Sequence, residues 1–193
     1  RLNYEAIKRL AIEYQPKMII AGYTSYPWQP DWEKFREIAD AVPGGAILMA
    51  DIAHPAGMVI AGEYPTPIGY ADVITMTTHK TLCGPRGALI ITTDRQKARQ
   101  IDRAIFPGEQ GGPHVNKFAA IAVTFKIAQT ERFGKLQRKI VENAKDLASA
   151  LQRRGLRLAY GGTDTHLLLI DLNAIETKSG YPLKGEVAAR ILD

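Results

Sequence analysis

The chain has 193 residues and a formal net charge of +5. Hydrophobic residues make up 46% of it and charged residues 23%, which is ordinary globular composition and excludes a disordered chain, a collagen-like repeat and a coiled coil. No apolar run approaches the roughly 18 residues of a membrane helix, so we expect no membrane partner. The single cysteine, Cys83, excludes a disulfide framework and favours a reducing compartment, which leads us to predict a cytoplasmic protein.

The first half of the chain alternates amphipathic helices with short apolar runs. Helices are predicted at residues 3–14 and 32–42, the second with Asp31 as its N-cap, and Asp94 is expected to cap a third. Four apolar runs are predicted to be buried strands: residues 18–21, 46–50, 71–76 and 88–92. This alternation predicts an α/β fold with a parallel or mixed sheet covered by helices on both faces.

The second half begins with a glycine-rich loop at residues 106–113. Helices are predicted at residues 114–129 and 135–154, and Gly155 is expected to end the second one. We expect the apolar face of that helix to contain five residues: Leu136, Ile140, Ala144, Leu147 and Leu151.

The end of the chain suggests a second, smaller α+β domain. Residues 156–159 and 166–172 are strand-like, and they follow the long helix. We therefore predict a large domain over residues 1–130, and a connecting helix with the start of a small domain over residues 131–193. Because the sequence starts at Arg1 in a helical pattern and stops inside an amphipathic helix, we expect a fragment of a longer protein.

Polar and ionisable residues that are candidates for a functional site follow three of the predicted strands. In parallel sheets, ligands bind beyond the carboxyl ends of the strands, so we expect segments 22–26, 51–54 and 77–80 to meet at one edge. Lys80 lies in an otherwise uncharged, hydroxyl-rich segment, where a partly desolvated lysine can form a Schiff base. Asp51 needs a cationic partner at a strand end, and the pyridinium nitrogen of pyridoxal phosphate is one candidate.

Other interpretations of these residues remain open from spacing alone. Lys80 could be an ordinary surface lysine, and Asp51 could cap a loop. Asp51 and His54 could bind a metal, but the chain offers no helical pair of histidines to complete the site, and we predict none. Gly111 and Gly112 could bring backbone N–H groups to a phosphate, although glycine loops are usually only turns.

Basic residues are concentrated in the second half. Residues 95–193 hold 17 lysines and arginines against 10 acidic residues, mostly on predicted helices. One interpretation is a surface for a polyanion. We favour solvated helix faces instead and expect no nucleic-acid partner, because the segment lacks the interleaved aromatic residues of a single-strand binder. The basic residues concerned include Arg95, Lys97, Arg99, Arg103, Arg138, Lys139, Arg153 and Arg154.

Five motifs, in order and with matching spacing, resemble the serine hydroxymethyltransferase family. The lysine motif is DVITMTTHKTLCGPRG at residues 72–87. The other four are AGYTSYP at 21–27, DIAHPAG at 51–57, FPGEQGGP at 106–113 and GGTDTHL at 161–167. The resemblance covers the whole chain, but the chain would cover somewhat under half of the family's length.

The resemblance implies a fold-type I pyridoxal phosphate enzyme that interconverts serine and glycine and passes the one-carbon unit to tetrahydrofolate. It implies that Lys80 binds the cofactor covalently, that Asp51 pairs with the pyridine nitrogen, and that His54 lies near the phenolic oxygen. Thr77 and His79 would influence how the substrate amine displaces Lys80 and which reaction follows. The remaining cofactor contacts that it implies are Thr24, where the family has serine, Arg86, and the backbone N–H groups of Gly111 and Gly112.

In this family the glycine pair acts from the neighbouring subunit, so the resemblance implies a homodimer or tetramer with shared active sites. The acid/base glutamate and the carboxylate-binding arginine lie outside this chain, which we therefore expect to be inactive alone. Two alternatives are another fold-type I enzyme, such as a threonine aldolase or an aminotransferase, and a non-catalytic fragment that binds or assembles.

Overall fold

The computed structural model describes residues 1–178 and 180–193. It divides into two compact units, one of residues 1–24 and 29–138 and the other of residues 25–28 and 139–193. This division falls inside a long helix, eight residues after the predicted boundary between residues 130 and 131. Among the helices of the described residues, none is long and apolar enough to cross a membrane.

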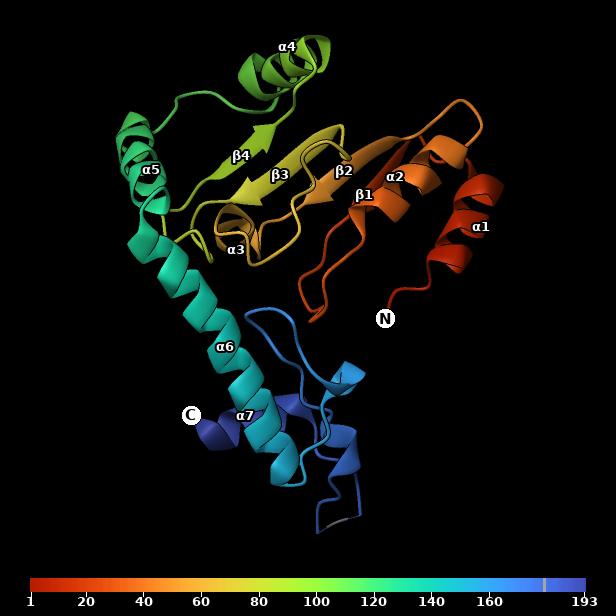
Figure 1. The fold of residues 1–193 in the computed structure, drawn as a ribbon, viewed down its shortest axis with the longest axis vertical. Helices are drawn as coiled ribbons and strands as arrows, with labels where there is room; N and C mark the ends of the chain where they lie inside the picture. Colours follow the sequence, from red (N-terminus) through yellow and green to blue (C-terminus); the bar gives the residue numbers. More distant parts are fainter. Residues whose placement is uncertain (179) are drawn as a thin grey trace. The chain divides into compact units, whose positions relative to one another are not determined.

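A four-stranded mixed sheet forms the centre of the first unit (Figure 1). The strands are β1 (Met18–Ala21), β2 (Ile47–Asp51), β3 (Val73–Thr77) and β4 (Ala88–Ile91), in that spatial order. Strands β1, β2 and β3 are parallel, and β4 is antiparallel to β3. The predicted strands and the predicted α/β class are therefore confirmed, with shifts of one or two residues at their ends.

The register of the sheet brings the ends of three strands to one edge. Ala21 of β1 pairs with Ala50 of β2, and Asp51 of β2 pairs with Thr75 of β3. Because the three strands run in the same direction, the loops that follow them leave the sheet at the same edge.

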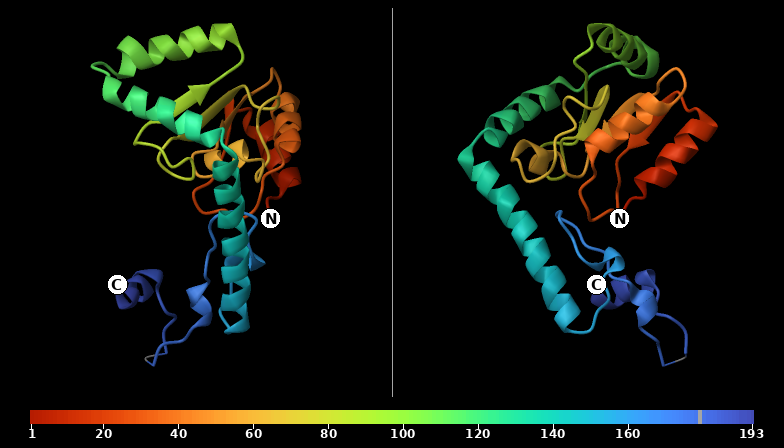
Figure 2. Two further views of the ribbon diagram at one scale, coloured as in Figure 1. Left: turned by 60° about the vertical axis from the view of Figure 1, so that its left-hand side comes forward. Right: turned by 45° about the vertical axis from the view of Figure 1, so that its right-hand side comes forward.

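Two helices pack against each other beside the sheet, as Figure 2 shows. They are α1 (Tyr4–Tyr14) and α2 (Trp32–Ala41). The carboxylate of Asp31 accepts a hydrogen bond from the Lys34 N–H at 3.1 Å, which confirms the predicted cap. Helix α2 buries Phe35 and Ile38 in a core that also contains Leu48 of β2.

Helices flank the mostly parallel sheet as predicted, but two side chains of the edge strands β1 and β4 are well exposed. Ile20 of β1 is 63% exposed and Ile90 of β4 is 43% exposed. The helix after β4, α4 (Arg95–Arg103), buries none of its side chains. Its sequence is mostly arginine and glutamine, so it has no apolar stripe with which to cover a sheet.

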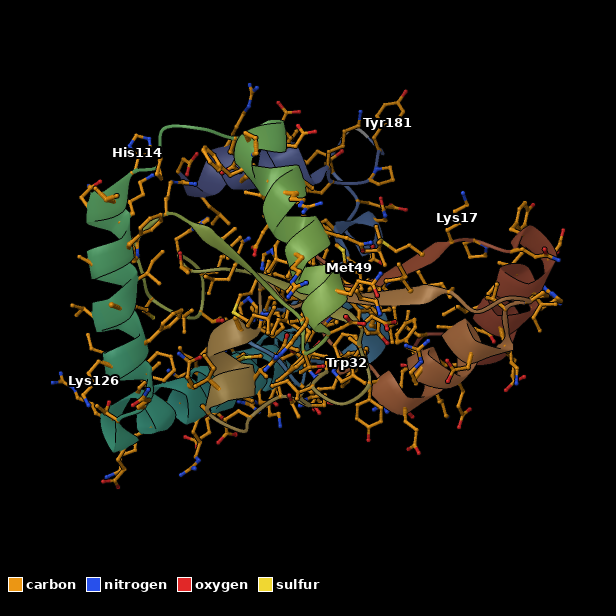
Figure 3. The ribbon with its side chains drawn as sticks, turned by 90° about the horizontal axis from the view of Figure 1, so that it is seen from above. Lys17, Trp32, Met49, His114, Lys126 and Tyr181 are labelled. Carbon is orange, nitrogen blue, oxygen red and sulfur yellow. The ribbon has the colours of Figure 1, made fainter. Side chains whose placement is uncertain are left out.

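Three further helices and an irregular turn follow in the first unit. They are α3 (Ala56–Ile60), an irregular turn at Ala104–Glu109, α5 (Val115–Ala128), and the first part of α6 (Glu131–Arg153). Figure 3 shows His114 and Lys126 near opposite ends of α5. Helix α6 buries Phe133, Gln137, Val141, Ala144 and Ala148. Its buried face is thus rotated from the predicted one, and Leu136 and Leu147 are 46% and 51% exposed.

In the second unit, the predicted strands at residues 156–159 and 166–172 are replaced by turns. A single bridge joins Leu158 to Ile170, and short 3-10 helices span Ala159–Gly161 and Leu172–Ala174. The Thr163 hydroxyl donates to the Leu167 carbonyl at 2.5 Å, so a side chain takes an acceptor that a strand ladder would use. Gly155 adopts a φ of +83° after α6, as predicted, and α7 spans Gly185–Leu192.

An ion cluster surrounds Asp72 at the edge of the sheet opposite the carboxyl ends of β1, β2 and β3. The Asp72 carboxylate accepts hydrogen bonds from Arg36 and from the Leu48 N–H, both at 2.8 Å. The Lys97 ammonium lies 3.6 Å from the same carboxylate. The cluster therefore joins α2, β2, the start of β3 and α4.

The surroundings of Asp72 predict acid sensitivity. Partial burial raises the pKa of this carboxyl, but the Leu48 N–H and Arg36 outweigh burial and hold the pKa below its ordinary value. A carboxylate with a depressed folded-state pKa stabilises the fold fully above its unfolded pKa of about 3.9, and this contribution is lost as the pH falls through the folded-state pKa. We expect urea-measured stability to fall below about pH 4, and to fall less in Asp72→Asn. Identical pH profiles for the two chains would contradict this assignment.

Candidate functional site

The loops after β2 and β3 are joined by hydrogen bonds around Thr77. The Lys80 ammonium donates to the Thr77 hydroxyl at 3.1 Å, and that hydroxyl donates to the Ala53 carbonyl at 3.1 Å. The Asp51 carboxylate accepts from the Ala53 N–H at 2.9 Å. The structure thus brings two of the predicted segments, 51–54 and 77–80, to one place.

The loop after β1 passes directly against Asp51. A β-carbon built on Gly22 would lie 2.6 Å from the Asp51 β-carbon, and it would be closer still to the Asp51 carbonyl oxygen. Side-chain atoms are not tolerated at such distances, so this approach requires glycine. The third predicted segment therefore reaches the same edge at Gly22.

Two histidines add to the site. Burial, and then the charge of Lys80, lower the pKa of His54, while the charge of Asp51 acts in the opposite direction. His54 is therefore predominantly neutral at neutral pH, which leaves a ring nitrogen able to accept a hydrogen bond. The Nδ1 atom of His79 is buried, and it has no hydrogen-bond partner among the described residues. An unsatisfied buried nitrogen beside Lys80 is a position where a bound molecule could contribute the missing partner.

The segment that carries Lys80 is a tightly closed loop. The Thr78 hydroxyl donates to the Pro85 carbonyl at 2.5 Å, and the Gly84 N–H donates to the Thr78 carbonyl at 2.6 Å. Cys83 adopts a φ of +61°, and its N–H donates to the Lys80 carbonyl at 2.9 Å. These bonds hold Lys80 in a defined backbone conformation at the end of β3.

The structure does not bring four other predicted residues to Lys80. Thr24 and Arg86 have exposed side chains, and no contact described for residues 1–178 and 180–193 joins either of them to Lys80 or Asp51. Gly111 and Gly112 lie in an exposed loop, with nothing within 4 Å of where their β-carbons would be. A role in cofactor binding therefore remains a prediction for these four residues.

The basic residues of the second half are partly engaged in ion pairs. Lys97 contacts Asp72 and Asp94, and Arg138 contacts Glu63 at 3.0 Å. Some of the basic residues thus have acidic partners, and the expectation of solvated helix faces stays a prediction. Within the described part of the chain, no group of three or more histidine, cysteine, aspartate or glutamate residues could hold a metal ion.

The arrangement can bind a ligand through an amine, a carboxylate and two imidazole rings at one sheet edge. A sequence model of serine hydroxymethyltransferase matches residues 1–192. The chain belongs to the serine hydroxymethyltransferase family. Members of this family have the fold-type I architecture of pyridoxal phosphate enzymes, and the mixed α/β sheet agrees with it.

Three curated relatives carry the name serine hydroxymethyltransferase. The relative from Wolbachia pipientis wMel is 53% identical over 173 residues, which is 90% of this chain and 40% of the relative. Relatives from Wolbachia sp. subsp. Drosophila simulans (strain wRi) and Wolbachia sp. subsp. Brugia malayi (strain TRS) are each 52% identical, over 90% and 89% of this chain. Each alignment covers 40% of the relative, so the chain spans well under half of their length.

One contact in this member of the serine hydroxymethyltransferase family was not foreseen from the sequence. Gly57 of α3 packs against the carbonyl of Thr81, and a β-carbon on Gly57 would lie 2.5 Å from the Thr81 carbonyl carbon and 2.9 Å from Gln137 Nε2. Thr81 and Gln137 are also absent from the predicted site. Their only sequence signals are a hydroxyl beside Lys80 and a polar residue within a helix, and neither signal is specific.

We expect Gly57→Ala to lower the free energy of unfolding by about 2–3 kcal/mol, because the methyl group would force the Lys80 loop away from α3. Urea denaturation measures this change. Gly134→Ala in α6 is the matched control, since nothing lies within 4 Å of its β-carbon position. That change should stabilise the helix by about 0.5–1 kcal/mol. Equal effects of the two substitutions would show that the Gly57 contact is not restrictive.

Proposed function

We propose that this protein uses pyridoxal phosphate to interconvert serine and glycine, with transfer of the one-carbon unit to tetrahydrofolate. The single observation that carries the proposal is the set of Lys80, Asp51 and His54 at one sheet edge in a chain of the serine hydroxymethyltransferase family. The relatives named serine hydroxymethyltransferase support the same activity.

The residues present fit pyridoxal phosphate. Lys80 would hold it covalently through its amine, and Asp51 would accept a hydrogen bond from its ring nitrogen. The buried Nδ1 of His79 lacks a partner in the described residues, and a bound molecule at this edge could supply one. His54 would lie near the phenolic oxygen, and Thr24 and Arg86 would complete the polar contacts.

When bound, the cofactor supplies an electron sink for the electron pair left on the substrate α-carbon as the Cα–Cβ bond breaks. Asp51 would keep a proton on the ring nitrogen, because a carboxylate favours the cationic form of its partner. The Thr77 hydroxyl accepts from the Lys80 ammonium and so orients it. The lowered pKa of His54 keeps this imidazole neutral, so that it adds no second positive charge beside Lys80.

We further propose a cytoplasmic homodimer or tetramer in which Gly111 and Gly112 offer backbone N–H groups to the phosphate of a neighbouring subunit. Their exposure in this single chain supports the proposal, because two glycines in open space have no packing role of their own. Serine, glycine and folate would be the small-molecule partners.

The experiment that tests the function is an assay of the protein at its full natural length. We expect glycine formation from serine that requires both pyridoxal phosphate and tetrahydrofolate. The same assay on the 193-residue chain alone should give no turnover. Threonine cleavage without folate as the main activity would instead indicate a threonine aldolase, and amino-group transfer to a keto acid would indicate an aminotransferase.

A further inference from the structure

Thr81, the residue after Lys80, is held by hydrogen bonds to two separate segments of the first unit. Its hydroxyl accepts a hydrogen bond from the Gly57 N–H at 3.0 Å and donates one to the His54 carbonyl at 2.5 Å. Its carbonyl accepts a hydrogen bond from the Gln137 side chain at 2.7 Å. The backbone that follows Lys80 is therefore joined to the segment that carries His54 and to helix α6.

Gln137 makes the contact from helix α6, and its side chain is fully buried. Its Nε2 donates to Thr81, whereas its Oε1 is buried without a hydrogen-bond partner in the described part of the chain. Burial of an unpaired amide oxygen is unfavourable, so an apolar residue would pack more favourably at this position. The one favourable polar contact of the Gln137 side chain among the described residues is therefore its hydrogen bond to the Thr81 carbonyl.

We propose that Gln137 is a positioning residue that fixes the Lys80 loop relative to His54 by holding the carbonyl of Thr81. The proposal rests on the proposed function only in taking Lys80 as the cofactor lysine. The Thr81 hydroxyl sets the spacing to the His54 backbone, and Gln137 prevents the Thr81 peptide plane from rotating away. A β-carbon on Gly57 would approach both the Thr81 carbonyl carbon and Gln137 Nε2, so the Gly57 backbone, the Thr81 carbonyl and the Gln137 amide are packed together at one point.

Two variants of Gln137 and one control isolate this bond. Gln137→Met keeps the length and volume of the side chain but removes the donor. Gln137→Glu keeps the shape and can donate only when its carboxyl is protonated, which burial favours. Phe133→Leu is the control, because Phe133 lies one turn earlier on the buried face of α6, is 3% exposed, and belongs to the hydrophobic core.

The first measurement is the titration of the His54 ring by NMR in the chain without cofactor. The charge of Lys80 contributes to the lowered pKa of His54, and Asp51 opposes it. In Gln137→Met we expect the pKa of His54 to move toward its ordinary value, because the Lys80 loop is released. In Phe133→Leu we expect the pKa of His54 to stay as in the native chain. A His54 titration in Gln137→Met that matches the native chain would overturn the proposal.

The second measurement is the yield of borohydride-trapped pyridoxal phosphate on Lys80. We expect Gln137→Met to lower this yield about fivefold, which corresponds to the loss of one ordinary hydrogen bond. The yield in Gln137→Glu divided by the yield in Gln137→Met should rise as the pH is lowered, because protonation of the introduced carboxyl restores a hydrogen-bond donor. Equal yields in Gln137→Met and Phe133→Leu would overturn the proposal. A native chain that leaves Lys80 unlabelled would contradict the proposed function, while the His54 titration would still decide the role of Gln137.

Discussion

Lys80→Ala is expected to reduce the borohydride-trapped attachment of pyridoxal phosphate to background. The covalent bond needs the Lys80 amine, which is held 3.1 Å from the Thr77 hydroxyl at the edge that also carries Asp51. An alanine offers no nucleophile there. The chain is incubated with pyridoxal phosphate, reduced and digested, and the mass shift is assigned to a peptide, with the intact mass recorded in the same run.

Lys17→Ala is the control for this experiment. Lys17, labelled in Figure 3, immediately precedes β1, whereas Lys80 follows β3. Because β1, β2 and β3 are parallel, the two lysines lie at opposite edges of the sheet. We expect its removal to leave the adduct on Lys80 unchanged. Labelling spread over surface lysines, or undiminished labelling in Lys80→Ala, would contradict the assignment of Lys80 as the cofactor lysine.

Asp72→Ala is expected to lower the free energy of unfolding by about 2–3 kcal/mol. The change removes the acceptor of the Arg36 guanidinium and of the Leu48 N–H, both of which contact Asp72 at 2.8 Å. It leaves a half-buried arginine and a strand N–H without this partner. Urea denaturation at neutral pH measures the effect, and an unchanged m value would show that the folded state is otherwise preserved.

Asp40→Ala provides a comparison at the same arginine. Asp40 also lies 2.8 Å from Arg36, but its side chain is 66% exposed, whereas that of Asp72 is 26% exposed. Exposed ion pairs contribute about 0–1 kcal/mol, so we expect a much smaller loss. If the two substitutions have equal effects, burial is not the reason for the contribution of Asp72.

Local patterns in the sequence were sufficient to predict most elements of the first unit. The run at Met18–Ala21 is a strand at its predicted residues, and Asp31 and Asp94 cap helices as expected. These features depend on near neighbours, because a cap bonds to N–H groups two or three residues later. The meeting of segments 51–54 and 77–80 was also predictable, since parallel strands align their carboxyl ends.

Sequence patterns gave wrong strand predictions where side chains compete with the backbone for hydrogen-bond partners. The strands expected at 156–159 and 166–172 are turns in the structure. The Thr163 hydroxyl donates a hydrogen bond to the Leu167 carbonyl, and the Asp171 carboxylate accepts one from the Asn173 N–H. Each of these bonds is local, but no propensity predicts which of two local partners a carbonyl or N–H will choose.

By itself the sequence determined most elements of the first unit, the order of the loops that carry the candidate site, and the choice of Lys80, Asp51 and His54 as candidate residues. Only the tertiary structure decided which face of α6 is buried, because apolar residues occupy two neighbouring stripes of that helix and the packing partner selects one. That rotation buries Gln137 in place of Leu136, and it brings an amide to the carbonyl of Thr81, 56 residues earlier. A hydrogen bond between residues so distant leaves no periodic signal in the sequence, since it exists only when the loop and the helix have packed together.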